Sequence, residues 1–513
     1  MYEEGRRETA QIKNVTTGRQ HQGGLPAGKG VWVMADKEIK ISETEEMAEK
    51  DKLLSKNFKY PVSIGYAALV TGCVFGFVAV GLILFDAPLE LMFLLSWIVV
   101  VPLLMRLGYR YGELQEMAWE MAAASFEPNV VLIVIGAMIA VWIASGTIPM
   151  VIYMGLKFIS PKIFLLSALI LSSFTSLATG TSWGTLGTVG LALIGIGNAM
   201  GIPSPMTAGA IICGAYFGDK MSPLSDSTIL AASVSGTDVM THVKHMLWTT
   251  APAYAITAIL FVILGLHHAS GVYDTSTANE IMATFSQFYN FSLLEFLPIG
   301  IVLVLLVENT PSIIALMIGT ASGMFVAVLH QNVVLGQLLD YMVNGFVIDT
   351  GSSFVDILLN RGGIMSMMSA FLAIFLALCI SGMLDKTGVL SVLVNPLIKK
   401  CGNSSFKIIA CTAVLTYVTN AIGSSMLFAS IVTAALMKDI FSENHIAPEN
   451  LSRTLEDAGT FGAVLIPWNS NAIYASQMLG VAPLAFIPYC FLNWITPVID
   501  LIYAKTGFTV NKI

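Results

Sequence analysis

Charged residues are scarce in this sequence. Asp, Glu, Lys and Arg make up 12% of its 513 residues and hydrophobic residues 55%, whereas about 25% of an ordinary soluble domain is charged. No Lys or Arg occurs between residues 245 and 360. The formal net charge of −7 says little about partners in so apolar a chain. We therefore expect no nucleic-acid partner, and a lipid environment for most of the chain.

Motifs of common enzyme active sites are also missing. The sequence has no HExxH, no P-loop and no GxSxG in a suitable setting, and YFGD at 216–219 departs from GxGD because Tyr216 stands first. These absences predict that the protein is not an enzyme, does not use ATP and needs no cofactor. The six cysteines form no CxxC pair, which favours packing residues over a disulfide framework or a zinc site.

Long apolar runs are abundant instead. A helix of about 20 apolar residues crosses a hydrocarbon core about 30 Å thick, and a helix satisfies its own backbone groups within lipid. The clearest runs are 62–85, 90–106, 128–147, 243–266, 293–309, 311–330, 363–383 and 482–504. The predicted fold class is an all-α polytopic membrane protein whose main partner is the lipid bilayer.

The positions of Lys and Arg orient the chain. Lysines such as Lys56 and Lys59 precede the first run, and Lys505 and Lys512 follow the last. Positively charged flanks stay in the cytoplasm, so both termini are predicted to be cytoplasmic in a multi-pass protein of the cell membrane; no signal peptide is recognised. The predicted organisation is a polar cytoplasmic tail at 1–60 (with 1–33 an upstream extension or a cloning remnant), a transmembrane repeat at 61–267, an external linker at 268–292, a second repeat at 293–505 and a cytoplasmic C-terminus at 506–513.

A weak internal repeat supports this division into halves. IASG at 143–146 resembles CISG at 379–382, ATGTSWGT at 178–185 aligns with VTNAIGSS at 418–425, and Pro223 aligns with Pro467, at offsets of 236, 240 and 244 residues. By the charge rule the first half runs from inside to outside and the second half runs back. Related halves would therefore be two inverted-topology repeats. Chance similarity between apolar segments is the alternative.

Polar clusters interrupt the apolar segments at corresponding places in the two halves. Such clusters break helices or form re-entrant hairpins, and backbone of this kind survives at membrane depth only when it lines a cavity or is buried in protein. Freed carbonyls and hydroxyl or amide oxygens suit a hard cation. The residues predicted to line this cavity are Thr181, Ser182, Ser222, Ser225, Asn420, Ser424, Asn469 and Asn471.

Charged residues accompany these breaks. Each charge at the bilayer centre costs about 2.5–3.5 kcal/mol, so Asp219, Lys220 and Asp226 should be buried away from lipid, around a wet cavity. With Asp457 they are the predicted ion- or proton-binding residues, and Asp219 and Asp226 are the predicted Na⁺ ligands. Adjacent helical residues diverge, so Asp226 or Asp457 is the expected partner of Lys220. A structural salt bridge around Lys220, and a solvated turn for Asp457, are the alternatives.

Four further side chains have two interpretations each. Trp183 and Trp468 lie at breaks, where packing is favoured over a role as ligands. His242 and His245, in THVKHM, are either surface residues or a pH sensor.

Three segments resemble the NhaC family of Na⁺/H⁺ antiporters. The most specific is GDKMSPLSDSTILAASVSGTDVMTHVKHMLWTT at 218–250, and ATGTSWGTLGTVG at 178–190 and LIPWNSNAIY at 465–474 are similar to that family as well. The resemblance implies an inverted-repeat antiporter with helical hairpins that exchanges a monovalent cation against protons. It also implies relatives that exchange malate and lactate with coupled ions, and others that carry amino acids. The long polar N-terminus departs from the family pattern.

Two transport functions follow from these observations. A carboxylate that holds either Na⁺ or H⁺ makes the two ions compete, which predicts secondary Na⁺/H⁺ exchange. The alternative is a Na⁺/H⁺-coupled organic-acid antiporter for malate and lactate, in which Lys220 and helix N-termini would bind the acid. Small ions or small organic acids are thus the expected cargo, and the oligomeric state is left open.

Overall fold

The computed structural model describes residues 59–85, 87–123, 126–269, 275–308, 310–399, 402 and 404–513. Apart from Lys59 and Tyr60, the tail predicted at 1–60 lies outside these residues. The described residues form helices and no strand, with one isolated bridge between Ile446 and Lys512. The predicted all-α class is confirmed.

The first half of the chain contributes helices of very different length, because polar breaks cut several apolar runs. Its elements are α2 (Ile64–Phe85), α3 (Leu89–Arg106), α4 (Tyr111–Ala122), α5 (Phe126–Ala144), α6 (Thr147–Phe158), η2 (Pro161–Ile163), α7 (Phe164–Thr179), α8 (Ser182–Thr185), the π-helical η3 (Leu186–Gly190), α9 (Leu191–Ala199), α10 (Ser204–Met221), α11 (Asp226–Ser235) and α12 (Val239–Ala269).

The second half shows the same mixture of long and broken helices. Its elements are α13 (Thr275–Phe288), η4 (Leu294–Phe296), α14 (Leu297–Val307), α15 (Ser312–Leu329), α16 (Leu335–Asn344), α17 (Ser353–Leu359), η5 (Ile364–Met367), α18 (Met368–Lys386), α19 (Val389–Lys399), α20 (Ser405–Gly423), α21 (Met426–Glu443), α22 (Pro448–Leu455), the π-helical η6 (Glu456–Thr460), α23 (Phe461–Ala463), α24 (Ser470–Leu479), α25 (Pro483–Phe486), η7 (Ile487–Tyr489) and α26 (Phe491–Thr506). Helix α13 lies within the segment predicted as an external linker.

Within the described residues, seven helices are long and apolar enough to cross a membrane, and two bent pairs bring the number to nine. One bent pair joins α5 to α6 at 67°, and the other joins α24 to the α25–η7 segment at 88°. These helices make the protein a multi-pass membrane protein. The spans at Pro161–Thr179 and Ser405–Gly423 were not among the clear apolar runs, because Ser and Thr lower their hydropathy.

Helix breaks recur in the two halves at similar separations. Gly180 and Ser424 both adopt a left-handed conformation, with φ of 68° and 52°. Each precedes a residue whose side chain caps the next helix: Thr181 accepts from the amide of Gly184, and Ser425 accepts from the amide of Phe428. The separation of these caps is 425 − 181 = 244 residues. Helices α11 and α24 begin and end at positions with the same separation.

The recurrence corrects two of the three sequence alignments. The expected offset of 240 for the 178–185 stretch is wrong, since the caps place it at 244. The offset of 236 for IASG is also wrong: Gly146, with φ of 79°, corresponds to Gly388, with φ of 82°, at 242 residues, and not to Gly382 inside α18. Similar letters in apolar helices misled the alignment, whereas backbone conformation marks the true breaks. The opposite orientation of the two halves stays a prediction.

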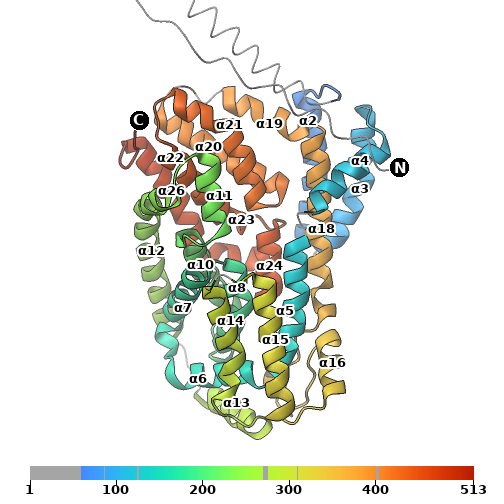
Figure 1. Ribbon diagram of the computed structural model, residues 1–513, viewed down its shortest axis with the longest axis vertical. Helices are drawn as coiled ribbons and strands as arrows, with labels where there is room; N and C mark the ends of the chain where they lie inside the picture. Colours follow the sequence, from blue (N-terminus) through green and yellow to red (C-terminus); the bar gives the residue numbers. More distant parts are fainter. Residues whose placement is uncertain are drawn as a thin grey trace, which may run out of the picture. The chain divides into compact units, whose positions relative to one another are not determined.

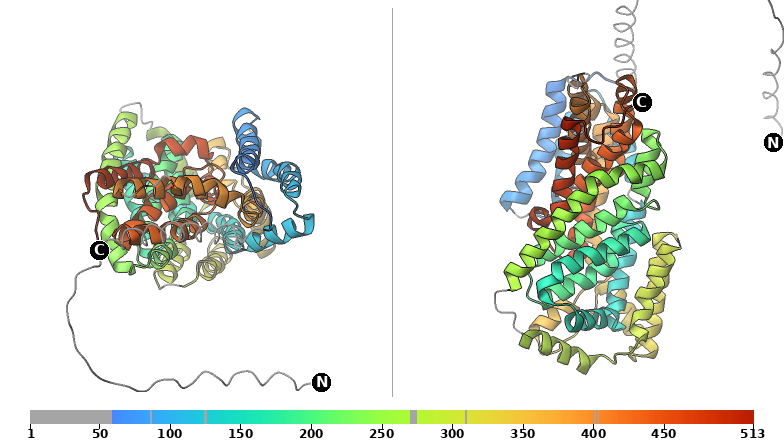
Figure 2. Two further views of the ribbon diagram at one scale, coloured as in Figure 1. Left: turned by 90° about the horizontal axis from the view of Figure 1, so that it is seen from above. Right: turned by 90° about the vertical axis from the view of Figure 1, so that its left-hand side faces the viewer.

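Close helix packing positions the central residues. Helices α7 and α10 lie side by side (Figure 1), and a Cβ on Gly214 would come within 2.3 Å of the Leu169 carbonyl oxygen. Gly218 approaches the backbone of Leu177 equally closely. The long helix α12 runs along the outside of α7 and α10 in the side view of Figure 2. Glycine on this face of α10 therefore lets its last turn, which carries Asp219, reach the broken segment at Gly180.

The cysteines follow the packing interpretation with one exception. Cys213, Cys379 and Cys490 are buried free thiols, and Cys73 is half-buried. Cys411 is disulfide-bonded, which the absence of a CxxC pair did not predict. Cys401 lies outside the described residues.

Candidate functional site

Asp219 is held between two helix starts. Its carboxylate is buried and accepts hydrogen bonds from Ser182 Oγ at 2.6 Å and from Ser225 Oγ at 2.5 Å. Ser182 is the first residue of α8, after the break at Gly180, and Ser225 precedes α11 as its N-cap residue. Short hydroxyl–carboxylate contacts of this kind are charge-assisted. Three chain segments that are separated by breaks thus converge on one carboxylate.

Lys220 forms an ion pair with Asp457 from the second half of the chain. Both side chains are fully buried, and the ammonium group lies 4.6 Å from the centre of the Phe461 ring. The expected partner from the other half is confirmed. The alternative of a solvated turn at Asp457 is wrong, because a π-helical turn after α22 carries this residue into the interior.

Glu456, next to Asp457, was not identified from the sequence. Its side chain is 1% exposed, and neither carboxylate oxygen has a hydrogen-bond partner among the described residues. The charges of Lys220 and Asp219 act on it electrostatically. The sequence showed only that Glu456 is an acidic residue next to Asp457. A glutamate at a helix position usually lies on a solvated face, so nothing indicated that this one is buried.

Three asparagines form a second polar cluster at the breaks. Asn420 donates to the Gly459 carbonyl at 2.8 Å, and Asn469 donates to the Asn420 side-chain oxygen at 3.1 Å. The side-chain oxygen of Asn469 in turn accepts from Asn471 at 3.0 Å. All three are buried, and their role as cavity-lining residues stays a prediction.

Aromatic side chains connect the two clusters. The Asn471 oxygen accepts from Trp183 Nε1 and from the Tyr216 hydroxyl, each at 3.0 Å. Trp183 stacks on Tyr474 with ring centres 3.9 Å apart, so it both packs and donates. Trp468 donates to the Ala421 carbonyl oxygen at 2.8 Å. Trp183 therefore joins the first-half break to the Asn471 side chain of the second half, and Trp468 holds the backbone of the break at Ala421 within its own half.

Hydroxyl residues at the breaks differ in their surroundings. Ser222 is buried and accepts from the Leu224 amide at 3.4 Å, and Thr181 is half-buried as the N-cap of α8. Ser424 is buried, and its hydroxyl has no hydrogen-bond partner within the described part of the chain.

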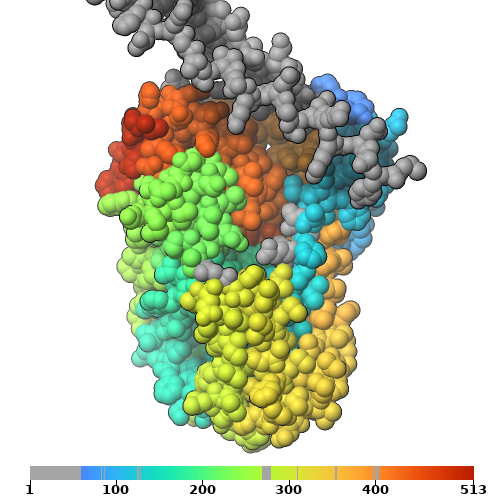
Figure 3. Space-filling view, viewed as in Figure 1, coloured from blue at the N-terminus to red at the C-terminus, as the bar shows by residue number. Residues whose placement is uncertain are grey.

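Asp226 is separate from the buried carboxylates. It is exposed, unlike the buried Asp219 and Asp457, so burial of its carboxylate is not confirmed. Asp226 is the first residue of α11, and the free N–H groups and positive dipole end of a helix stabilise a carboxylate there while it stays in water. Helix α11 belongs to the green segment on the face visible in Figure 3. Its charge nevertheless acts on Asp219.

The two histidines of THVKHM are buried, and not at the surface. His242 is 0% exposed, and its Nδ1 lies 2.7 Å from Ser452 Oγ on α22. His245 is 6% exposed and interacts with Asn450 and Arg453. The polar letters around them suggested a solvated helix end, but α22 packs over this end of α12.

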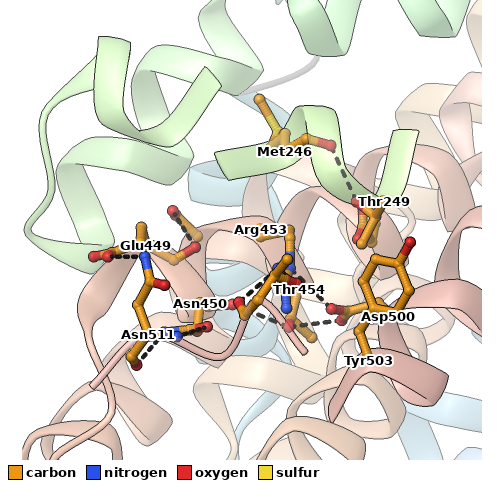
Figure 4. A network of polar contacts seen from close by, with 12 residues as sticks. Met246, Thr249, Glu449, Asn450, Arg453, Thr454, Asp500, Tyr503 and Asn511 are labelled. Atoms are coloured by element: carbon orange, nitrogen blue, oxygen red, sulfur yellow. Dashed lines mark hydrogen bonds and ion pairs between the residues drawn. The ribbon is translucent and has the colours of Figure 1, made fainter. Parts of the chain in front are cut away.

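A further polar network surrounds the start of α22 (Figure 4). Arg453 is fully buried and donates to Asp500 at 3.0 Å and to the Thr509 carbonyl at 3.2 Å. Asn511 of the C-terminal segment donates to Glu449 at 2.8 Å, and Asn450 donates to the Asn511 carbonyl at 2.9 Å. The C-terminal segment therefore holds α22, whose next turn carries Glu456 and Asp457.

The donor chemistry of this centre is hard oxygen. No group of three or more His, Cys, Asp or Glu side chains suited to a tightly bound metal occurs in the described ranges. The carboxylate of Asp219 and the hydroxyls of Ser182 and Ser225 offer four oxygens of the type that binds a hard monovalent or divalent cation. A pocket of about 520 Å³ lined by Met150, Tyr289 and His330 lies elsewhere and shares no lining residue with this centre.

Comparison with known proteins gives consistent matches. The model of the Na⁺/H⁺ antiporter family matches residues 214–508. A malate-2H⁺/Na⁺-lactate antiporter of Bacillus subtilis is 39% identical over 422 residues, 82% of this chain and 90% of the relative. The Na⁺/H⁺ antiporter NhaC of Alkalihalophilus pseudofirmus is 32% identical over 88% of this chain and 97% of its own length. An arginine/ornithine antiporter, ArcD, of Halobacterium salinarum is 33% identical over 87% of this chain and 92% of its own length.

Proposed function

The chain belongs to the Na⁺/H⁺ antiporter family, and on that premise we propose that it is a secondary antiporter that exchanges Na⁺ for H⁺. Asp219 carries this proposal. A buried carboxylate at the meeting point of two helix breaks accepts either one cation or one proton. The two ions then compete for the same oxygens, and movement of one against the other requires no covalent chemistry.

The hydroxyls of Ser182 and Ser225 adapt to either occupant. In the described geometry both donate to Asp219. A hydroxyl also carries two acceptor lone pairs, so rotation of these groups would turn their oxygens toward Na⁺ when it replaces the hydrogen bonds. We propose Asp219, Ser182 and Ser225 as the Na⁺-binding residues, with the unpartnered hydroxyl of Ser424 and the asparagines 420, 469 and 471 along the cavity.

The ion pair of Lys220 and Asp457 joins the two halves beside this site. Its proposed role is to hold the α10 turn against the π-helical turn, because both charges need each other once they leave water. Thr181 and Ser222 are proposed as cavity residues on the basis of their position at the same breaks.

The cell membrane is the proposed location, with both termini in the cytoplasm. The lysines before α2 and the residues Lys505 and Lys512 support this orientation through the positive-inside rule, as does the absence of Lys and Arg from 245 to 360.

Exchange of organic acids is the second candidate, and the malate/lactate relative at 39% identity favours it. A dicarboxylate needs a cationic partner in the cavity. The buried cations near the centre are Lys220 and Arg453, and these are paired with Asp457 and Asp500. Such an acid would therefore have to displace a carboxylate of the protein, which makes the inorganic cation the better-supported cargo.

Purified protein in liposomes tests the proposal. A Na⁺ gradient is expected to drive proton movement, read by an internal pH dye, in the absence of any organic acid. Li⁺, K⁺, malate, lactate and arginine serve as the panel of competing cargoes. Proton movement that requires malate and lactate would replace Na⁺/H⁺ exchange by the second candidate.

The exposed position of Asp226 leads to a milder expectation for its neutralisation. Removing a charge that acts on the Asp219 site through solvent costs about 1 kcal/mol or less. We expect Asp226→Asn to keep exchange while the apparent Na⁺ affinity falls by up to about fivefold. Initial rates of proton movement against Na⁺ concentration measure this. Complete loss of exchange would instead identify Asp226 as a direct ligand.

A further inference from the structure

This inference rests on the proposed exchange at Asp219 and concerns the way in which a proton reaches it. Asp219 is buried, so a proton that leaves it must pass through other groups. Two features mark a route: a pair of hydroxyls that begins at Asp219, and the unpaired carboxyl of Glu456.

The hydroxyl pair lies on the start of α11. Ser225 Oγ donates to Asp219 at 2.5 Å and lies 3.1 Å from Ser227 Oγ. Ser227 is buried on α11, and this helix packs against the π-helical turn that carries Glu456. A chain of hydroxyls passes a proton by forming one O–H bond as the next one breaks, so no electron transfer or further reactant is needed.

Glu456 differs from the other buried carboxylates of the region. Asp219 accepts two hydroxyls, Asp457 has Lys220, and Asp500 has Arg453. Neither oxygen of Glu456 has a hydrogen-bond partner in the described residues. A buried charged group without donors is costly, so this carboxyl fits a site that holds a proton and releases it on demand.

Beyond Glu456, one face of α22 leads to the end of the protein that holds the C-terminus. Residues 449, 452 and 456 follow the i, i+3, i+7 spacing of a single helix face. Ser452 contacts the buried His242, and Glu449 is half-buried, where it meets Asn511 (Figure 4). His242 Nε2 has no hydrogen-bond partner within the described ranges, so this ring nitrogen is not engaged by another group there.

We propose that Glu456 is a proton-transfer residue of the exchanger, which receives the proton of Asp219 through Ser225 and Ser227 and passes it along Ser452 and His242 toward the end of α22. When Na⁺ occupies Asp219, the proton resides on Glu456 or has left through His242. When the proton returns, the O–H bond of Glu456 breaks as one forms on Asp219.

The charged groups around Glu456 influence the pH at which it gains or loses its proton. The titratable and charged groups on elements packed around Glu456 are Asp219 and Lys220 of α10, Asp226 of α11, Tyr417 of α20, Arg453 of α22, Asp457 of its own turn and Asp500 of α26, while Lys438, Asp439 and Glu443 of α21 are exposed. On the histidine side, Lys220, His245 and Arg453 are the neighbouring charges.

Two transport modes in liposomes separate proton transfer from Na⁺ binding. The first mode is proton movement driven by a Na⁺ gradient, and the second is exchange of radioactive sodium for unlabelled sodium at equal pH, which needs no proton. Glu456→Gln is expected to slow the first mode about 100-fold, the scale on which a positioned proton carrier contributes, and to leave the second mode near the wild-type rate. Glu116→Gln, an exposed site on α4, is the matched control.

Two milder variants make the test independent of the folding of Glu456→Gln. Ser227→Ala should slow Na⁺-driven proton movement and leave sodium exchange unchanged, and Ser233→Ala at an exposed site on the same helix is its control. His242→Gln should have the same effect, with His445→Gln at an exposed histidine as its control. Glu456→Asp should keep proton movement with a shifted pH profile. Three results would overturn this route. They are unchanged proton movement in Glu456→Gln or Ser227→Ala, an unchanged pH profile in Glu456→Asp, and equal loss of both transport modes in a variant that folds. Absence of Na⁺-driven proton movement in the wild type would instead overturn the proposed function.

Discussion

Asp219→Asn is expected to abolish both transport modes, with a loss of about 100-fold or more in Na⁺-driven proton movement. The amide carries no charge for Na⁺ and cannot take up the exchanged proton. Its oxygen can still accept from Ser182 or Ser225, so the helix breaks keep a partner and the fold should persist. The readouts are proton movement and sodium exchange in liposomes, together with the elution profile of the purified variant.

The control for this variant is the same change at an exposed aspartate. Asp439→Asn on α21 alters the net charge equally and should leave both modes at the wild-type rate. If Asp219→Asn retained rapid exchange, Na⁺ and H⁺ would have to bind at another carboxylate, and the buried Glu456 and Asp457 would become the next candidates. The pattern also differs from that of Glu456→Gln, in which only the proton-dependent mode is lost.

The fold class was predictable because lipid imposes a strong constraint on sequence. Apolar runs marked helices such as α2, α3, α15 and α18, and their ends follow the predicted runs within a few residues. Helices α7 and α20 were less visible, since Ser and Thr are tolerated in buried helices when they donate to the carbonyl one turn back, as Thr412 and Thr416 do. Composition therefore finds lipid-facing spans more readily than inner ones.

The candidate site was predictable in part. Breaks at Gly180, Ser222 and Asn469 were visible as clusters of residues that leave helices, and helix geometry narrowed the partner of Lys220 to Asp226 or Asp457. Burial was not predictable for Asp226 and Glu456, which have the same kind of side chain and opposite environments. One begins a helix at the surface, and the other lies in a π-helical turn that no local pattern announces.

The two halves share several backbone breaks and contacts but not their charges. Ser176 donates to the Ala215 carbonyl at 2.5 Å, and Asn420 makes the corresponding contact to Gly459 at 2.8 Å, with both residues 244 positions further along. Asp219 corresponds to Ala463 at this separation, and Asp457 corresponds to Cys213. The first half thus places Asp219 at the end of a helix, whereas the second half places Glu456 and Asp457 earlier along the equivalent segment. The ion pair of Lys220 and Asp457 therefore forms between the two halves.

Neutralising one partner of the Lys220–Asp457 pair is expected to have the largest effect on stability. Each charge is fully buried, and removing one leaves the other without compensation. Lys220→Met and Asp457→Asn should each lower the free energy of unfolding by about 3–5 kcal/mol. The double variant should regain much of this loss, because replacement of both charges of a buried pair is often close to neutral. Unfolding of purified protein in detergent, analysed as a double-mutant cycle, measures the coupling.

An exposed pair supplies the control for that cycle. Lys386 and Glu120 approach within 2.7 Å and are 48% and 64% exposed, so Lys386→Met, Glu120→Gln and their combination should change stability little. Additive losses at Lys220 and Asp457 would contradict a compensated pair and indicate that each side chain stabilises the protein through separate contacts. If the double variant folds, its transport decides the remaining question. Preserved exchange would limit the pair to holding the two halves together, whereas lost exchange in a stable protein would show that its charges also set the binding of Na⁺ and H⁺ at Asp219.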